Sequence, residues 1–207
     1  MAVVRHLAWR RQSEKGATQD STEDWVRRVC AGDAAAFERI FERYGRAILR
    51  FLHDMVGDSE TAEDLAQETF VRAYQHLHEL RQPDKLSTWL FGIARNVARE
   101  SLRKRQRERP LMDIQEDAQV ANPRLTVPSP ERAALRDELN QTIRDALQSL
   151  DEDRRTVFSL RVFHEQSYEE IAAITGFSLS KLKSDLHRAR VEMRQRIRPY
   201  LESPNEV

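Results

Sequence analysis

SYEEIAAITGFSLSKLKSDLHRAR, at residues 167–190, predicts two short helices, Tyr168–Thr175 and Leu179–Arg198, with a tight turn between them. Gly176 suits a left-handed turn position, and Ser178 is a candidate N-cap for the second helix. The outer face of that helix carries side chains that can donate hydrogen bonds to phosphates and base edges: Ser180, Lys181, Lys183, Ser184, His187, Arg188 and Arg190. We interpret the pattern as a DNA-binding helix-turn-helix. The alternative is an ordinary helical hairpin with a solvated basic face.

Helical periodicity also runs through the rest of the chain, and we find no convincing strand pattern. Further helices are predicted from near 24 to 29, from 33 to 56, from 58 to 77, from 87 to 107, from 131 to 150 and from 154 to 163. Prolines and acids without periodicity indicate a linker. We therefore predict an all-α fold of two helical domains with these boundaries: a disordered extension at 1–22, a helical domain at 23–109, a flexible linker at 110–130 and a second helical domain at 131–201.

The charge of the chain is neutral in sum, with 34 Lys and Arg against 34 Asp and Glu, but it is unevenly distributed. Residues 83–109 hold 8 basic and 3 acidic residues, and residues 181–198 hold 7 and 2, so each segment has a net charge of +5. Residues 33–82 have a net charge of −4, and residues 110–153 of −6. Because nucleic-acid binding depends on clustered charge, the neutral sum does not exclude it.

Two further motifs lie in the N-terminal half. In STWLFGIARNVARESLRKR (87–105), one helix face is apolar and the other is expected to expose Arg95, Asn96, Arg99 and Arg103, which suit phosphates. The alternative is a solvated basic helix end that complements the helix dipole. In DLAQETFVRAY (64–74), Asp64, Gln67 and Glu68 form an acidic edge that suits a basic protein surface. The alternative is that these acids, which lie near a helix start, only complement the helix dipole and contact solvent.

These three motifs together, in this order, resemble bacterial sigma factors of the extracytoplasmic-function group, over about residues 30–200. The resemblance implies that the first domain is sigma region 2 and the second is sigma region 4. It assigns binding of core RNA polymerase to Asp64, Leu65, Gln67, Glu68 and Phe70. It assigns the −10 promoter element to Lys85, Ser87, Arg95, Asn96, Arg99 and Arg103, and the −35 element to the seven residues of the basic helix face named above.

The implied partners are core RNA polymerase (its β′ and β subunits), promoter DNA and an anti-sigma factor. No small-molecule substrate and no cofactor are expected. The location implied is the cytoplasm, and the role is transcription initiation in a stress or envelope response. Two residues depart from the family pattern. Asp185 stands where similar sequences usually have a basic residue, and Lys181 where many have a small polar one.

Other classes of protein find less support. The single cysteine, Cys30, excludes an internal disulfide and is expected to be a buried thiol. His76 and His78 are two residues apart on a helix, which does not favour a metal site. There is no apolar run long enough for a membrane span and no signal peptide. There is also no nucleophile–base pair, so an enzyme is the interpretation with the least support. A helix-turn-helix regulator that is not a polymerase subunit, and a helical adaptor without a DNA role, remain alternatives.

Overall fold

The computed structural model describes residues 21–108 and 130–202, and all the regular secondary structure in these ranges is helical. The N-terminal domain contains α1 (Thr22–Cys30), α2 (Ala34–Val56), α3 (Ser59–His76) and α4 (Leu86–Glu108), with the short 3₁₀ turns Leu77–Glu79 and Pro83–Lys85 before α4. The C-terminal domain contains α5 (Pro130–Gln148), α6 (Glu152–Phe158), the π-helical turn Ser159–Phe163, α7 (Tyr168–Thr175) and α8 (Leu179–Glu202). The all-α prediction is confirmed. The predicted extension and linker lie almost entirely outside the described residues.

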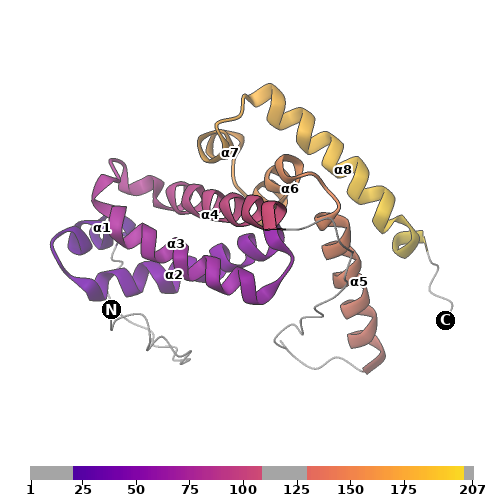
Figure 1. Cartoon of the computed structure of the whole chain (residues 1–207), viewed down its shortest axis with the longest axis horizontal. Coiled ribbons are helices and arrows are strands. Elements are labelled where there is room, and N and C mark those ends of the chain that lie inside the picture. Colours follow the sequence, from indigo (N-terminus) through magenta and orange to yellow (C-terminus); the bar gives the residue numbers. More distant parts are fainter. Residues whose placement is uncertain (1–20, 109–129, 203–207) are drawn as a thin grey trace.

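Helices α2, α3 and α4 of the N-terminal domain pack side by side into a bundle (Figure 1). The carboxylate of Asp33 caps α2 by accepting from the backbone N–H groups of Ala35 and Ala36. Gly57, at a φ of 77°, ends α2 in the left-handed conformation, and Asp58 caps α3. The bundle therefore presents the outer faces of α3 and α4 at fixed positions.

The C-terminal domain ends in the predicted helix-turn-helix. Ser167 and Glu170 form a capping box at the start of α7, and Gly176, at a φ of 73°, ends that helix. The hydroxyl of Ser178 accepts from the backbone N–H of Lys181, 3.3 Å away, as the predicted cap should. The bounds of α7 are those predicted, and α8 extends four residues beyond the predicted end.

The two domains pack against each other, and their buried apolar side chains form one continuous core. Helix α7 lies against α4, while α5 and α6 lie against α2 (Figure 1). The ring of His164 is buried among Phe51 and Phe91, with ring centroids 5.8 and 5.2 Å away. Its Nε2 lies 3.4 Å from Oδ2 of Asp54, which also accepts a 2.5 Å hydrogen bond from Ser159. The interface is therefore both apolar and hydrogen-bonded.

Three further expectations can be compared with the structure. Cys30 is exposed at the end of α1, so the prediction of a buried thiol is wrong; it lies at a helix end that the bundle does not cover. Helix α4 begins at Leu86, one residue before the predicted Ser87, because the 3₁₀ turn leads directly into it. None of the described helices has the length and apolar character that spanning a membrane requires.

Candidate nucleic-acid and protein interfaces

The outward face of α8 presents most of the residues predicted for −35 recognition. Leu182, Leu186 and Ala189 are buried on the opposite face and hold the helix against the domain. The exposed members of the predicted set are Ser180, Lys183, Ser184, His187, Arg188 and Arg190. They share one side of a regular helix, which gives the hydroxyl, imidazole, ammonium and guanidinium donors that DNA recognition requires.

Lys181 is the exception, because its ammonium is held within the domain. Its Nζ lies 2.5 Å from Oδ2 of Asp185 and 3.0 Å from Oδ2 of Asp153, and 4.1 Å from the ring centroid of Phe177. The hydrogen bond to Asp185, followed by that to Asp153, raises the pKa of Lys181. Asp185 is 8% exposed. The two departures from the family pattern are thus the two halves of one i,i+4 ion pair.

The predicted −10 residues of α4 divide into exposed and covered positions. Lys85, Asn96 and Arg103 are exposed, and Ser87 is half-buried. Arg95 is 6% exposed, so the prediction that it lies on the outer face is wrong in this conformation. Its guanidinium sits 5.4 Å from the ring centroid of Phe177, and burial, with the neighbouring Arg99, lowers its pKa. The C-terminal domain covers Arg95 through Phe177.

Arg99 is also engaged by the C-terminal domain. Its Nε lies 2.6 Å from Oε1 of Glu152, and the two side chains are 32% and 30% exposed. Neither Glu152 nor Phe177 was singled out from the sequence. Acids in the first turn of a helix are ordinarily explained by the helix dipole, and their partner here is 53 residues away.

A shallow groove of about 280 Å³ lies between the outer faces of α3 and α4. It is lined by Arg72, His76, Glu79, Trp89, Ile93 and Asn96. Trp89 offers an aromatic face and Asn96 an amide, which are the groups that stack on an unpaired base and bond its edge. Nδ1 of His76 lies 2.9 Å from Oε1 of Glu79 at the rim.

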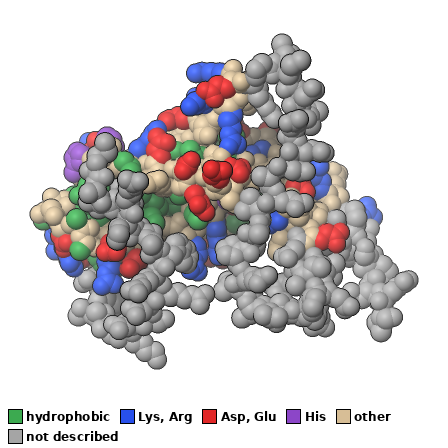
Figure 2. Space-filling model, turned by 60° about the horizontal axis from the view of Figure 1, so that its bottom comes forward, with side chains coloured by type: hydrophobic (Ala, Val, Ile, Leu, Met, Phe, Trp, Pro, Cys, Tyr) green, Lys and Arg blue, Asp and Glu red, His purple; other side chains and the backbone are tan. Residues whose placement is uncertain are grey.

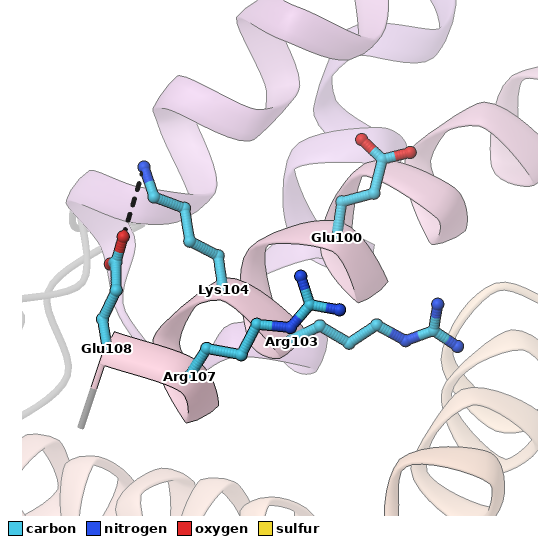
Figure 3. Close-up of a pocket in the computed structure, with 5 residues that line it drawn as sticks. All are labelled: Glu100, Arg103, Lys104, Arg107 and Glu108. Atoms are coloured by element: carbon cyan, nitrogen blue, oxygen red, sulfur yellow. Dashed lines mark ion pairs between the residues drawn. The ribbon is translucent and has the colours of Figure 1, made fainter. Parts of the chain in front are cut away.

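The basic side chains at the C-terminal end of α4 point in different directions. Figure 3 shows Arg103 and Arg107 on one side of the helix, while Lys104 turns toward Glu108, whose carboxylate is 3.9 Å away. These residues, with Glu100, line a second open pocket of about 440 Å³. Arg105 instead reaches back to Thr61 and to Asp58, 3.8 Å away, at the start of α3. Arg103 and Arg107 are therefore the side chains best placed to extend a phosphate-binding surface.

The acidic edge of α3 is exposed as predicted at Asp64, Gln67 and Glu68. Leu65 and Phe70, at 8% and 5% exposed, are buried in the bundle and hold the helix in place, so their binding of core polymerase stays a prediction. The guanidinium of Arg72 bridges Glu68 and Glu100 at 2.6 and 2.7 Å. Val71 and Tyr74, exposed by 38% and 51%, add an apolar patch along the same helix that the sequence did not single out.

Charged and hydrophobic side chains are distributed differently on the face of the molecule seen in Figure 2. On the face seen in Figure 2, acidic and basic side chains are interspersed, and hydrophobic side chains gather over the N-terminal domain. Within residues 21–108 and 130–202, no group of three or more His, Cys, Asp or Glu side chains is arranged to hold a metal ion.

Known proteins resemble the chain over both domains. Residues 40–108 match the family model "Sigma-70 region 2", and residues 140–193 match "Sigma-70, region 4". The RNA polymerase sigma-H factor of Pseudomonas aeruginosa is 37% identical over 188 residues, covering 89% of this chain and 97% of that protein. The ECF RNA polymerase sigma factor SigW of Bacillus subtilis is 34% identical over 182 residues, covering 84% and 95%. The sigma factor RpoE of Bartonella quintana, solved with the anti-sigma factor NepR, superposes with a TM-score of 0.66 at 26% identity, covering 78% of this chain and 96% of that one.

Proposed function

The chain belongs to the extracytoplasmic-function type of the sigma-70 family of RNA polymerase sigma factors, and on that premise we propose which of its surfaces meet polymerase and which meet DNA. A sigma factor is a non-enzymatic subunit that joins core RNA polymerase and directs transcription initiation at promoters. We propose that region 2 spans residues 23–109 and that region 4 spans 131–201. The observation that carries the assignment is the exposed polar and basic face of α8, presented on a helix whose other face is buried.

For core polymerase, we assign the edge of α3. Asp64, Gln67 and Glu68 are exposed on one side of a helix that Leu65 and Phe70 anchor, so the edge is rigid. The adjoining apolar side chains of Val71 and Tyr74 extend it, and together they form a partly apolar, partly acidic surface. Such a surface suits a helical partner with basic and apolar residues, and the resemblance implies that this partner is the β′ subunit.

For the −10 element, we assign the groove between α3 and α4 together with the turn before α4. Trp89 and Asn96 are placed to stack on and bond an unpaired base, and Lys85 and Arg103 lie near it as phosphate ligands. Arg95 and Arg99 join this surface once the C-terminal domain moves away. Holding one strand in this way favours DNA that is already opened.

For the −35 element, we assign the exposed face of α8 to the major groove. Arg188 and Lys183 are suited to phosphates or guanine edges, while the hydroxyls of Ser180 and Ser184 can donate to or accept from base edges. The pairing of Lys181 with Asp185 removes one cation from this set. We therefore expect Lys181 to contribute less to DNA binding than the exposed members of the set.

Regulation and location are inferred from relatives. The structure from Bartonella quintana holds its sigma factor with an anti-sigma factor, and we propose that a partner of this class binds the present chain as well. The relatives named as extracytoplasmic-function factors support a role in a stress or envelope response. Because core polymerase is the partner, we place the protein in the cytoplasm.

The decisive experiment combines the purified chain with core RNA polymerase and a promoter library, and sequences the run-off transcripts. We expect discrete start sites that disappear without the chain. Association with core should weaken in Gln67→Ala/Glu68→Ala, and remain normal in the control Glu42→Ala, whose exposed carboxylate lies on α2. If no core complex forms and no start site appears, the assignment fails. A helix-turn-helix regulator would instead bind duplex DNA specifically without core.

Binding at the −35 element can be tested on α8 itself. Arg188→Ala should weaken binding of the holoenzyme to the selected promoter and make its salt dependence shallower. Arg194→Ala removes the same charge from an exposed site six residues further along α8 and serves as the control. Equal effects of the two substitutions would place the DNA elsewhere.

A further inference from the structure

Leu179, the first residue of α8, presents an apolar side chain among the polar residues assigned to the −35 element. It is 46% exposed, whereas Leu182 and Leu186 on the inward face of the same helix are 0% and 1% exposed. Lys183 lies one helical turn beyond Leu179, so the two side chains share one side of the helix. Leu179 therefore adjoins the surface that is proposed to enter the major groove, although it was not singled out from the sequence.

The first turn of α8 offers DNA little positive charge from its side chains. Nζ of Lys181 lies 2.5 Å from Oδ2 of Asp185 and 3.0 Å from Oδ2 of Asp153, so this cation is already paired. The outward side chains that remain in the turn are the isobutyl group of Leu179 and the hydroxyl of Ser180. In helix-turn-helix proteins, the first residues of the recognition helix contact base edges. This turn therefore suits base edges better than phosphates.

The two outward side chains of this turn differ in what they can recognise on a base. The hydroxyl of Ser180 can donate to or accept from the edge of any base, so it discriminates little between bases. The isobutyl group of Leu179 forms no hydrogen bond, and the apolar group that a base pair displays in the major groove is the C5-methyl group of thymine. Contact between these two groups removes apolar surface from water, which favours thymine over a base that lacks the methyl group.

We propose that Leu179 is a specificity-determining residue that contacts the C5-methyl group of a thymine in the −35 element. The inference deepens the proposed function and rests on it, because it takes α8 as the helix that enters the major groove. Burial of one methyl group against an apolar side chain corresponds to about a three- to fivefold difference in affinity. The −35 element that this chain selects should therefore contain at least one thymine whose methyl group contributes to binding.

Replacing thymine by uracil tests the contact directly, because uracil lacks the methyl group and keeps every hydrogen-bonding group of thymine. Each thymine of the selected −35 element, on either strand, is replaced in turn by uracil in a fluorescein-labelled promoter duplex. The affinity of the reconstituted holoenzyme is measured by fluorescence anisotropy with the wild-type chain, Leu179→Ala and Val191→Ala. Val191, 39% exposed and 12 residues further along α8, is the control for the loss of an exposed apolar side chain.

In the wild type and in Val191→Ala, we expect uracil at one position of the −35 element to lower the affinity about three- to fivefold. Uracil in the spacer should have no effect. In Leu179→Ala, the same replacement in the −35 element should leave the affinity unchanged. Because each variant is compared with itself on the two bases, a general loss of affinity or stability in a variant does not alter the result.

Four results would overturn the assignment of Leu179 while leaving the proposed function intact. They are a selected −35 element without thymine, a wild type that is indifferent to every uracil, a preference for thymine that persists in Leu179→Ala, and a preference that is lost equally in Val191→Ala. A wild-type holoenzyme that neither forms nor binds any promoter would instead overturn the proposed function, and the assignment of Leu179 with it.

Discussion

Arg155 joins the two domains through one of its four hydrogen bonds and holds the α5–α6 connection with the other three, and replacing it by Met should separate the unfolding of the two domains. Its Nη1 donates to the backbone oxygen of Met55 at 2.6 Å and to Oε1 of Gln148 at 2.8 Å. Its Nη2 donates to the backbone oxygens of Gln148 and Leu150 at 2.7 and 2.9 Å. The guanidinium thus ties the end of α2 to the α5–α6 connection.

The size of the effect follows from these four bonds. A hydrogen bond to a charged group contributes about 1.5–3 kcal/mol, but bonds that share one side chain are not additive. Burial lowers the pKa of Arg155, so the folded state also bears a desolvation cost that Met removes. Met fills much of the same space, leaving the unpaired carbonyls as the main loss. We expect the free energy of unfolding to fall by about 2–3 kcal/mol.

Urea unfolding followed by two probes measures both the loss and the uncoupling. The three tryptophans of the chain lie at or before residue 89, so their fluorescence reports the N-terminal half, whereas circular dichroism reports helices of both domains. The wild-type transitions should coincide, and those of Arg155→Met should separate. Arg144→Met is the matched control, because Arg144 donates to Gln141 of its own helix. If the two variants lose equal stability with coincident transitions, the interface is not held as described.

Three other substitutions test the packing and the ionisation. Gly57→Ala should lower the free energy of unfolding by at least about 1 kcal/mol, because the φ of Gly57 is 77° and an added Cβ would lie 2.9 Å from Cδ of Gln148. Gly92→Ala should not destabilise the fold, because no atom lies within 4 Å of the added Cβ. Equal urea midpoints for these two variants would contradict this reasoning. Phe70→Ala should cost about 3–4 kcal/mol in thermal unfolding, because Phe70 is buried with the ring of Phe41 4.9 Å away; a loss below about 1 kcal/mol would be inconsistent with that burial. The hydrogen bond from the backbone N–H of Ser167 holds the pKa of Glu170 below its ordinary value of 4.5, so Glu170 stabilises the fold above that pH and loses its contribution as pH falls. Glu170→Gln should therefore flatten the acid limb of a stability profile, and parallel limbs would refute the assignment.

Local structure was predictable because it depends on neighbours in the chain. Gly176 ends α7 in the left-handed conformation, and the hydroxyl of Ser178 accepts from the backbone N–H of Lys181, as predicted. The helix-turn-helix followed from a short segment in which spacing, turn residue and cap agree. The exposed face of α8 was predictable for the same reason, since helical periodicity settles which side faces inward.

The parts that sequence reasoning missed depend on contacts between domains. Arg95 has the spacing of an exposed residue on α4, and it is buried because the turn at Phe177 packs over it. Glu152 has the position of an ordinary first-turn acid, and its partner Arg99 lies on another domain. No periodicity within one helix records such a partner. The burial of Leu65 and Phe70 was also not evident from the motif, because a family motif can combine residues that touch a partner with residues that hold the helix.

The uneven distribution of charge acquires a physical meaning in the folded chain. The acidic segment 110–153 ends in the very turn that reaches both basic segments, through Glu152 to α4 and Asp153 to α8. The opposite charges of different segments therefore not only cancel in the net charge of the chain but also lie next to each other in ion pairs. A free protein whose cations are paired in this way presents a weaker field to nonspecific DNA. Separating the domains increases the positive charge available to DNA without changing the net charge, so the DNA affinity of the chain should depend on its conformation as much as on its composition.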